Sequence, residues 1–337
     1  MSRTLADDVA AGAAGTVEAA AGLARPVDPR TDPGPADPGP ASPGAASPGP
    51  ASPGAASPGR LVGALRVLRF LVRRPGLSVS ALVLVLVVLA AFWPSLFTSQ
   101  DPLRGVPSQN FRSPGGGHWF GTDELGRDVF SRVVHGAQLS LKATLIAVGF
   151  AFVVGGLIGL VAGFVGRWVE DVLMRLVDVL LSIPSLFLSL ALVTALGYGT
   201  VKVAVAVGIA SVAGFARVTR AEVLRVRQAV FVEASRSCGA RWYSVLGRHV
   251  LPNAAGPVIV LATLEFGAAI LAVSSLSFLG YGAPPPAPEW GTLISEGRNY
   301  LANAWWLTAL PGLAIAATGL ATNRIARALD GEWSRQR

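Results

Sequence analysis

Between two long apolar blocks lies the polar stretch FVEASRSCGARWYSVLGRHVLPN, Phe231 to Asn253. It carries three arginines, one glutamate and one histidine, although only 14% of the 337 residues are charged and 52% are hydrophobic. Soluble domains have about a quarter charged residues. Several runs in this chain reach the ~20 apolar residues that cross a hydrocarbon core of ~30 Å. The sequence therefore predicts an all-α, polytopic membrane protein in which this stretch faces water.

Six apolar blocks of membrane length are expected to be transmembrane helices. They are Leu77–Leu96, Leu141–Val165, Val172–Leu196, Val201–Ala216, Ala254–Leu279 and Trp305–Ala321. Pro184 should kink the third block. Residues 1–60 hold no apolar run and repeat proline, glycine, alanine and serine, which predicts a disordered tail acting as a spacer. We therefore divide the chain into a cytoplasmic tail, 1–60, and a six-helix membrane domain, 61–337.

The distribution of basic residues predicts the orientation. With the N-terminus inside, the inner segments from Arg60 onward hold 17 Lys and Arg residues and the outer segments hold 7. This asymmetry places both termini in the cytoplasm. It also explains the net charge of +8 without a nucleic-acid partner. The single cysteine, Cys238, excludes an internal disulfide.

The opening stretch belongs to the fourth-to-fifth connection, residues 228–252. Its apolar side is expected at Trp242, Leu246 and Val250, which recur at helical spacing. Gly239 should hinge this helix to a shorter one before it, and Pro252 should end the second helix. The alternative is an interfacial loop that lies on the lipid surface.

The residues of this stretch resemble a known motif. Glu233-Ala234-Ser235, then Gly239, then Leu251-Pro252 are similar to the EAA loop of ABC importer permeases. Two further stretches, GTDELGRDVFSRVVHGAQLSL (121–141) and LSFLGYGAPPPAPEWGTLISEGR (276–298), resemble the dipeptide/oligopeptide/nickel branch of that family. Together with the six-span layout, the resemblance covers about residues 61–330. The order of its segments is similar to the C subunit, the second permease of a dipeptide system.

The resemblance implies a type I (MetI-like) permease fold in a bacterial plasma (inner) membrane, and a role in the import of dipeptides or oligopeptides. Nickel, other metal chelates and haem-like ligands remain alternative substrates. The implied partners are a homologous permease, forming a heterodimer, two cytoplasmic ATPase subunits, an extracytoplasmic substrate-binding protein and membrane lipid. The residues implied in ATPase coupling are Glu233, Ala234, Ser235, Gly239, Ala240, Trp242, Leu251 and Pro252. Segments 97–140 and 284–306 are expected to face the binding protein.

The chain is not expected to be an enzyme or to hold a cofactor or metal. A P-loop needs a lysine that follows a glycine, and neither Lys142 nor Lys202 does. ATP and Mg²⁺ are therefore expected on the partner ATPases. Asp128, Ser131 and His135 are close in sequence, but helical spacing often produces such neighbours. A passive channel and a membrane-embedded enzyme are the competing functions.

Two acidic residues fall inside expected spans, where ionised side chains cost about 2.5–3.5 kcal/mol on insertion scales. Asp178 is expected to form a local ion pair with Arg175. Glu265 has no basic residue within a turn or two. We therefore expect Glu265 to line the translocation path, with a hydrogen bond to a neighbouring span as the alternative.

Overall fold

The computed structural model describes residues 75–333, and the expected tail, 1–60, lies outside this range. Within it, helices are the regular secondary structure, and the only β-type contacts are two isolated bridges. The long helices are α3 (Pro75–Phe92), α4 (Val129–Val165), α5 (Arg167–Ser182), α6 (Ser185–Leu196), α7 (Thr200–Arg227), α10 (Leu251–Phe278) and α12 (Trp306–Trp333). The short elements are η1 (Pro94–Leu96), η2 (Pro107–Gln109), α8 (Val230–Ser237), α9 (Trp242–Val245), the π-helical turn η3 (Leu246–Val250), α11 (Trp290–Gly297) and η4 (Arg298–Tyr300). The expected all-α fold is confirmed.

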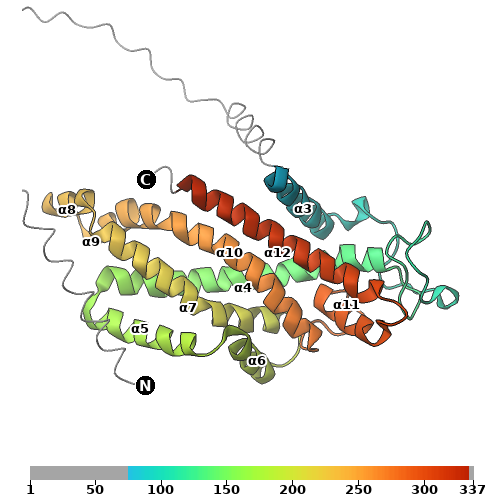
Figure 1. Ribbon diagram of the computed structural model, residues 1–337. Helices are drawn as coiled ribbons and strands as arrows, with labels where there is room; N and C mark the ends of the chain where they lie inside the picture. The colour runs from blue at the N-terminus through green and yellow to red at the C-terminus, as the bar shows by residue number, and fades with distance from the viewer. Residues whose placement is uncertain (1–74, 334–337) are drawn as a thin grey trace, which may run out of the picture. The chain divides into compact units, whose positions relative to one another are not determined.

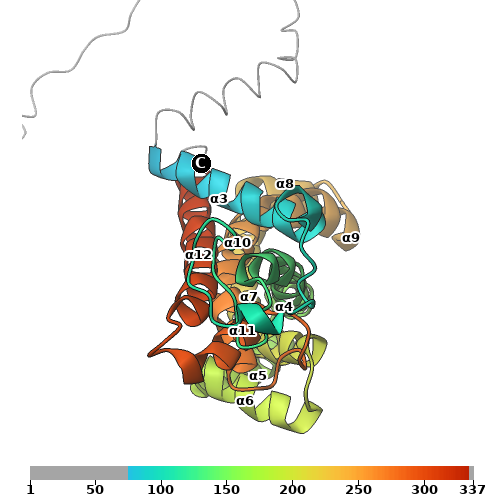
Figure 2. The ribbon, with the colours of Figure 1, turned by 90° about the vertical axis from the view of Figure 1, so that its right-hand side faces the viewer.

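The long helices α4, α7, α10 and α12 lie side by side (Figure 1). α11 and the loop that follows α3 lie at one end of this bundle, here called the α11 end. α8 and α9 lie at the opposite end, the α8 end. The view along the bundle places α3 on one side and α5 with α6 on the other (Figure 2). The two ends are therefore built from different elements.

The contact between α4 and α7 is a contact of backbone on backbone. A Cβ atom added to Gly155 would lie 2.5 Å from the Val212 carbonyl oxygen, and one added to Gly159 would lie 2.4 Å from that of Ala216. Small residues at such positions let two membrane helices approach closely. The adjoining core is buried and consists mainly of alanines and valines of α4 and α7, with Phe215 of α7, Val193 of α6, and Val273 and Leu276 among the contributions of α10.

α12 continues to Trp333, beyond the expected end at Ala321, and α4 and α7 are also longer than the sequence predicted. α4 begins at Val129 rather than near Leu141, because the Asp128 carboxylate accepts a hydrogen bond from the Ser131 backbone N–H (2.7 Å) and caps the helix. α4 has 37 residues, which at 1.5 Å per residue gives about 55 Å. α7 continues to Arg227, well beyond the expected end at Ala216. α4 and α7 therefore extend past the hydrocarbon thickness.

The expected third span is two helices. α5 and α6 meet at an angle of 92° around Ile183 and Pro184. Ile183 has extended backbone angles, φ −97° and ψ 127°, as expected for a residue that precedes proline. The predicted effect of Pro184 is confirmed, and the change of direction is large enough to end the helix.

Among residues 75–333, four helical runs have the length and composition of a membrane span. They are α3, α4, α7 and the continuous run Trp242–Phe278, and the bent pair of α5 and α6 raises the number to five. α12 is not among them, since its threonines, glycines and Pro311 dilute its apolar residues. A multi-pass membrane protein is established, while the sixth span stays a prediction.

The contact between α4 and α7 predicts a position-specific effect of added methyl groups. In Gly155→Ala the new Cβ atom meets the Val212 carbonyl and the Phe215 side chain, so the helices must separate. We expect a loss of about 1–3 kcal/mol, as for overpacked cores, read as a lower thermal midpoint of the detergent-purified chain.

The matched control is Gly156→Ala, one residue further along α4, where an added Cβ meets nothing within 4 Å. Its thermal midpoint should be unchanged or higher, because alanine favours a helix over glycine by about 1 kcal/mol. Equal midpoints for the two variants would contradict a tight contact between α4 and α7.

Candidate coupling segment and pathway residues

The segment from α8 to α9 is fixed to the helices that flank it. Val232 of α8, Val245 of α9 and Val250 of η3 are all fully buried. They form one apolar cluster with Val223 and Val226 at the end of α7. A displacement of α8 and α9 must therefore move the ends of α7 and α10 with them.

The turn between α8 and α9 explains the spacing of the motif. Gly239 has φ +82°, in the left-handed region that favours glycine. The Gly239 N–H donates to the Arg236 carbonyl (2.9 Å), and the Ala240 N–H donates to the Ser235 carbonyl (3.1 Å). This pair of bonds is the Schellman ending of a helix. Gly239 is the residue directly after Cys238, the C-cap of α8, and this position has the left-handed conformation. Glycine is therefore needed four residues after Ser235.

The surface of this segment is unusually apolar for a stretch that leaves the bundle. Four large side chains are exposed: Val230 (80%), Phe231 (48%), Trp242 (67%) and Tyr243 (53%). Of the residues implied in coupling, Glu233, Ala234, Gly239, Leu251 and Pro252 are exposed, while Ser235 and Ala240 are half-buried. The motif had not singled out Val230, Phe231 and Tyr243. Their signal in the sequence is the presence of bulky apolar residues inside a polar connection.

The apolar side expected for the second helix was wrong at one position. Trp242 was grouped with Leu246 and Val250, but its side chain is 67% exposed. The buried position belongs to Val245, at the end of the single turn of α9, while Trp242 at its start faces outward. The Trp242 ring lies against the rings of Phe164 and Tyr243, with centroids 6.4 and 5.8 Å away.

Pro252 does not end the second helix, contrary to the prediction. α9, η3 and α10 form one continuous helical run from Trp242 to Phe278. The turn before the proline is π-helical, and the Leu251 N–H donates to the Leu246 carbonyl. Proline has no N–H to donate, and the wider turn lets the helix pass this gap. The Asn253 side-chain amide also donates to the His249 carbonyl (2.6 Å).

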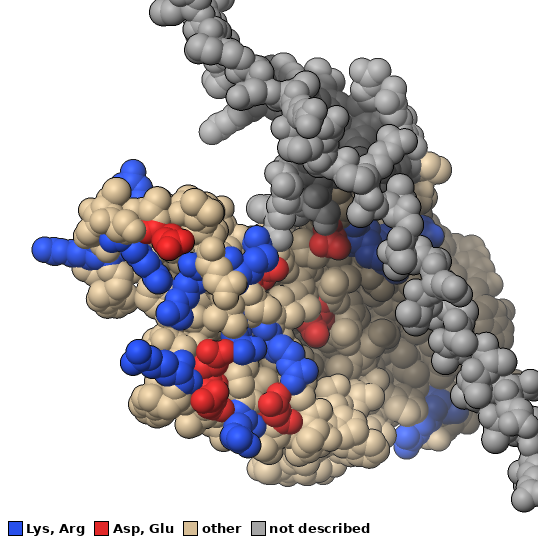
Figure 3. Space-filling view, turned by 60° about the vertical axis from the view of Figure 1, so that its left-hand side comes forward, with Lys and Arg blue, Asp and Glu red and all other residues tan. Residues whose placement is uncertain are grey.

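Arginines surround the exposed apolar side chains. Arg236, Arg241 and Arg248 are all exposed, and the Arg241 guanidinium donates to the Tyr243 hydroxyl (2.9 Å). The space-filling view brings the α8 end forward and shows basic groups on it with fewer acidic ones between them (Figure 3). Exposed aromatic side chains beside arginine are the residue types enriched at protein–protein contacts.

The two acidic residues of the expected spans have different surroundings. Asp178 pairs with Arg217 of α7, at 2.6 Å, and not with Arg175 as predicted, because the α7 arginine reaches across to α5. Glu265 is half-buried in the middle of α10. Within the described residues 75–333 it has no hydrogen-bond or ion-pair partner. A hydrogen bond to a neighbouring span, the alternative, is therefore absent from this part of the chain.

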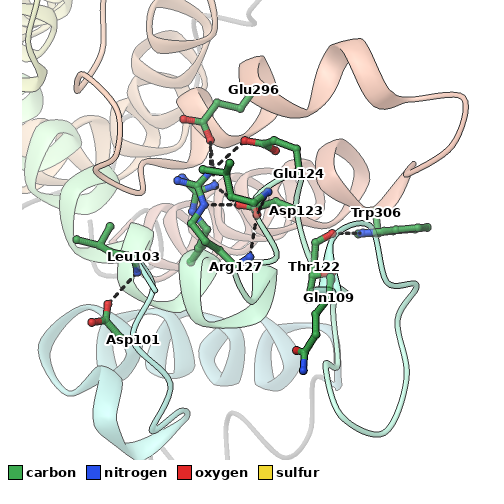
Figure 4. Close-up of polar contacts among 11 residues, drawn as sticks. Asp101, Leu103, Gln109, Thr122, Asp123, Glu124, Arg127, Glu296 and Trp306 are labelled. Carbon is green, nitrogen blue, oxygen red and sulfur yellow. Dashed lines mark hydrogen bonds and ion pairs between the residues drawn. The ribbon is translucent and has the colours of Figure 1, made fainter. Parts of the chain in front are cut away.

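At the α11 end, a buried ion network joins the two stretches expected to face outward (Figure 4). Arg127 donates from Nε to the Asp123 carboxylate (2.6 Å). Arg132 donates from Nη1 to Asp123 (2.8 Å) and to Glu296 of α11 (2.9 Å). The two arginines are 6% and 2% exposed. Residues 121–132 and 290–297 are therefore parts of one rigid end.

The neighbours Asp128, Ser131 and His135 do not form a hydrolytic relay. Asp128 contacts the ring of His118 instead (2.8 Å) and caps α4. The Ser131 hydroxyl donates to the Gln100 carbonyl (2.6 Å) and lies 3.4 Å from His135 Nδ1, which is closer to the Ser131 carbonyl (2.9 Å). Each polar group thus stabilises the start of α4 and the loop beside it.

Residues 155–335 match the family described as the inner membrane component of binding-protein-dependent transport systems. The dipeptide transport system permease protein DppC of Alkalihalophilus pseudofirmus is 38% identical over 247 residues, which are 73% of this chain and 81% of the relative. A probable D,D-dipeptide permease of Escherichia coli K12 is 39% identical, covering 72% and 82%. The glutathione permease GsiD of Pectobacterium atrosepticum is 37% identical, covering 76% and 85%.

Among solved structures, an inward-facing crystal form of the MetNI methionine ABC transporter aligns with 59% of this chain and 96% of its own. The TM-score is 0.47 and the sequence identity is 19%.

Proposed function

Since the chain belongs to the family of binding-protein-dependent transport system inner membrane components, we propose that it is a permease subunit of an ATP-driven ABC importer of dipeptides or oligopeptides. The relatives named for dipeptides and glutathione support peptide substrates. Nickel, metal chelates and haem-like ligands gain no specific support from them. The observation that carries the mechanism is the segment from α8 to α9, packed on α7 and α10 with large apolar side chains exposed.

The segment from α8 to α9 docks on a cytoplasmic ATPase subunit. Phe231, Trp242 and Tyr243 supply the apolar contact area, and the arginines around them supply charge for the rim of the contact. Because Val232 and Val245 are fully buried in the bundle, closure of the ATPases pulls α7 and α10 directly. ATP and Mg²⁺ bind to the partner subunits, and this chain converts their motion into opening of the path.

The remaining partners follow from the two ends. The α8 end, where the arginines gather, faces the cytoplasm under the positive-inside rule. Both termini then lie in the cytoplasm of a bacterial inner-membrane protein. The α11 end, made rigid by the Asp123–Arg132–Glu296 network, faces the substrate-binding protein. A homologous permease forms the other half of the path, so that substrate crosses between the two subunits.

The first prediction tests coupling and the function together. Gly239→Val places a β-branched residue at φ +82°, where such residues are strained. This breaks the turn between α8 and α9. In proteoliposomes with the partner permease, the ATPases and the binding protein, wild type should take up dipeptide only with ATP. The rate of ATP-dependent dipeptide uptake should be at least tenfold lower for the variant than for wild type, while the amount of variant inserted in the membrane stays the same.

The matched control is Gly247→Val in η3, the helical turn that follows α9, where an added Cβ meets nothing within 4 Å. It should transport like wild type. Uptake by the wild-type assembly without ATP would instead favour a passive channel. ATP-dependent dipeptide uptake at the wild-type rate in Gly239→Val would contradict the role that we assign to this turn.

A second prediction concerns the strength of ATPase docking. Trp242→Ala removes a 67%-exposed indole at the tip of the segment. Aromatic anchors of this kind contribute about 2 kcal/mol or more to a contact, which corresponds to roughly 30-fold weaker binding. Titration of purified ATPase against the permease in nanodiscs measures this change. Trp119→Ala is the control, because Trp119 is equally exposed (68%) but lies in the loop at the α11 end. It should leave the ATPase affinity unchanged.

A third prediction concerns Glu265, which we place on the translocation path. A half-buried carboxylate that lacks a protein partner is stable at this depth only if water or another subunit reaches it. Its charge suits the ammonium group of a peptide. Glu265→Gln keeps the shape and removes the charge, so uptake should fall severalfold while co-purification of the subunits is preserved. Wild-type uptake at every pH would reduce Glu265 to a packing role.

A further inference from the structure

α5 carries an exposed polar stripe along its length, in addition to Arg167 and Glu170 in its first turn. Its members recur at helical spacing: Asp171, Arg175, Asp178 and Ser182. All four side chains are exposed. The opposite face, around Val177, is buried against Ala213 and Ala216 of α7. The polar stripe therefore lies on the exposed side of α5.

A second exposed stripe on α5 is apolar and runs beside the polar one. Its members are Trp168 (72% exposed), Val172 (50%), Leu176 (60%) and Val179 (62%). Successive helical residues are 100° apart, so Arg175 and Leu176 lie at almost the same depth but point in different directions. The same holds for Asp178 and Val179. The polar stripe and the apolar stripe of α5 thus suit two different surroundings, one aqueous and one apolar.

Contacts with α7 fix the depth of these stripes. Glu170 of α5 pairs with Arg220 of α7, and a Cβ on Gly163 of α4 would lie 3.0 Å from the Arg220 carbonyl. The polar stripe is therefore level with the inner part of α4. There α4 exposes only large apolar side chains, Leu157 (56%) and Val161 (43%) among them. At this depth the exposed surface of α4 is apolar and suits lipid, whereas the exposed polar stripe of α5 does not.

The charges of the stripe are incompletely paired within the described chain. Asp178 pairs with Arg217, and both side chains are more than half exposed. Asp171 and Arg175 have no hydrogen-bond or ion-pair partner among residues 75–333. Unpaired ionised groups at this level face a bundle interior or a water-filled cavity rather than lipid. Such a sector of α5 needs water.

We propose that Asp171, Arg175, Asp178 and Ser182 line a water-filled vestibule of the transport path that opens at the α8 end. The apolar stripe beside them contacts lipid or apolar protein. This inference rests on the proposed function, since it assigns the inner wall of the same path.

Paired cysteine substitutions test the vestibule. In a Cys238→Ser background, which removes the single native cysteine, the pairs are Arg175→Cys with Leu176→Cys, Asp178→Cys with Val179→Cys, and Ser182→Cys with Ile183→Cys. Each pair compares neighbours at one depth. The probe is 2-sulfonatoethyl methanethiosulfonate, a charged reagent that does not cross membranes, applied to the assembled transporter in sealed vesicles of each orientation.

The polar-stripe cysteines should react at least tenfold faster than their partners, and only from the side that exposes the α8 end. Ser182→Cys guards against misfolding, because it leaves the Asp178–Arg217 pair intact. Labelling after denaturation shows that every cysteine is present and reactive. Equal rates within the pairs, or reaction only from the α11 side, would overturn the proposal. Absence of ATP-dependent dipeptide uptake in wild type would refute the proposed function while leaving the labelling pattern as it stands.

Discussion

The close contact between α4 and α7 is the constraint on which the rest of the bundle depends. At Gly155 and Gly159 the space for even one methyl group is occupied by backbone carbonyls and side chains of α7. In lipid there is no hydrophobic driving force between helices, so van der Waals contact of this closeness holds them together. α7 in turn carries α8 through Val223 and Val226, and α5 through Ala213 and Ala216. The positions of the segment from α8 to α9 and of α5 thus follow from the glycine-mediated fit between α4 and α7.

The two ends of the bundle use opposite kinds of surface chemistry. At the α11 end, the buried Asp123, Arg127 and Arg132 pair with one another and with the half-buried Glu296, which joins loop and helix. Breaking a buried ion pair by removing one partner typically costs about 3–5 kcal/mol, so this end resists deformation. At the α8 end, large apolar side chains are exposed and arginines stand around them. A surface of this kind suits contacts that form and separate during a cycle.

Most membrane helices and the turn at Gly239 could be predicted from the sequence. The length of the apolar runs indicates the helices, and the spacing of Gly239 from Ser235 indicates the turn. The errors have specific physical causes. The start of α4 at Val129 depends on the Asp128 cap, which is an interaction of one side chain and not a matter of hydropathy. The partner of Asp178 was misplaced because Arg217 lies 39 residues away in sequence. Pro252 was predicted to end the helix, but the π-helical turn before it lets the helix continue although proline has no backbone N–H to donate. The exposure of Trp242 depends on where α9 begins, which periodicity alone does not fix.

α4 runs without interruption for 37 residues, and this has a mechanical consequence. It begins at the ion network of Arg132 and ends beside the ion pair of Glu170 with Arg220. A rod of about 55 Å that tilts by about 5° moves its far end by about 5 Å, close to the rise of one helical turn. α4 is therefore a lever arm. An angular change too small to disturb the side-chain packing at one membrane face becomes a displacement of a whole turn at the other.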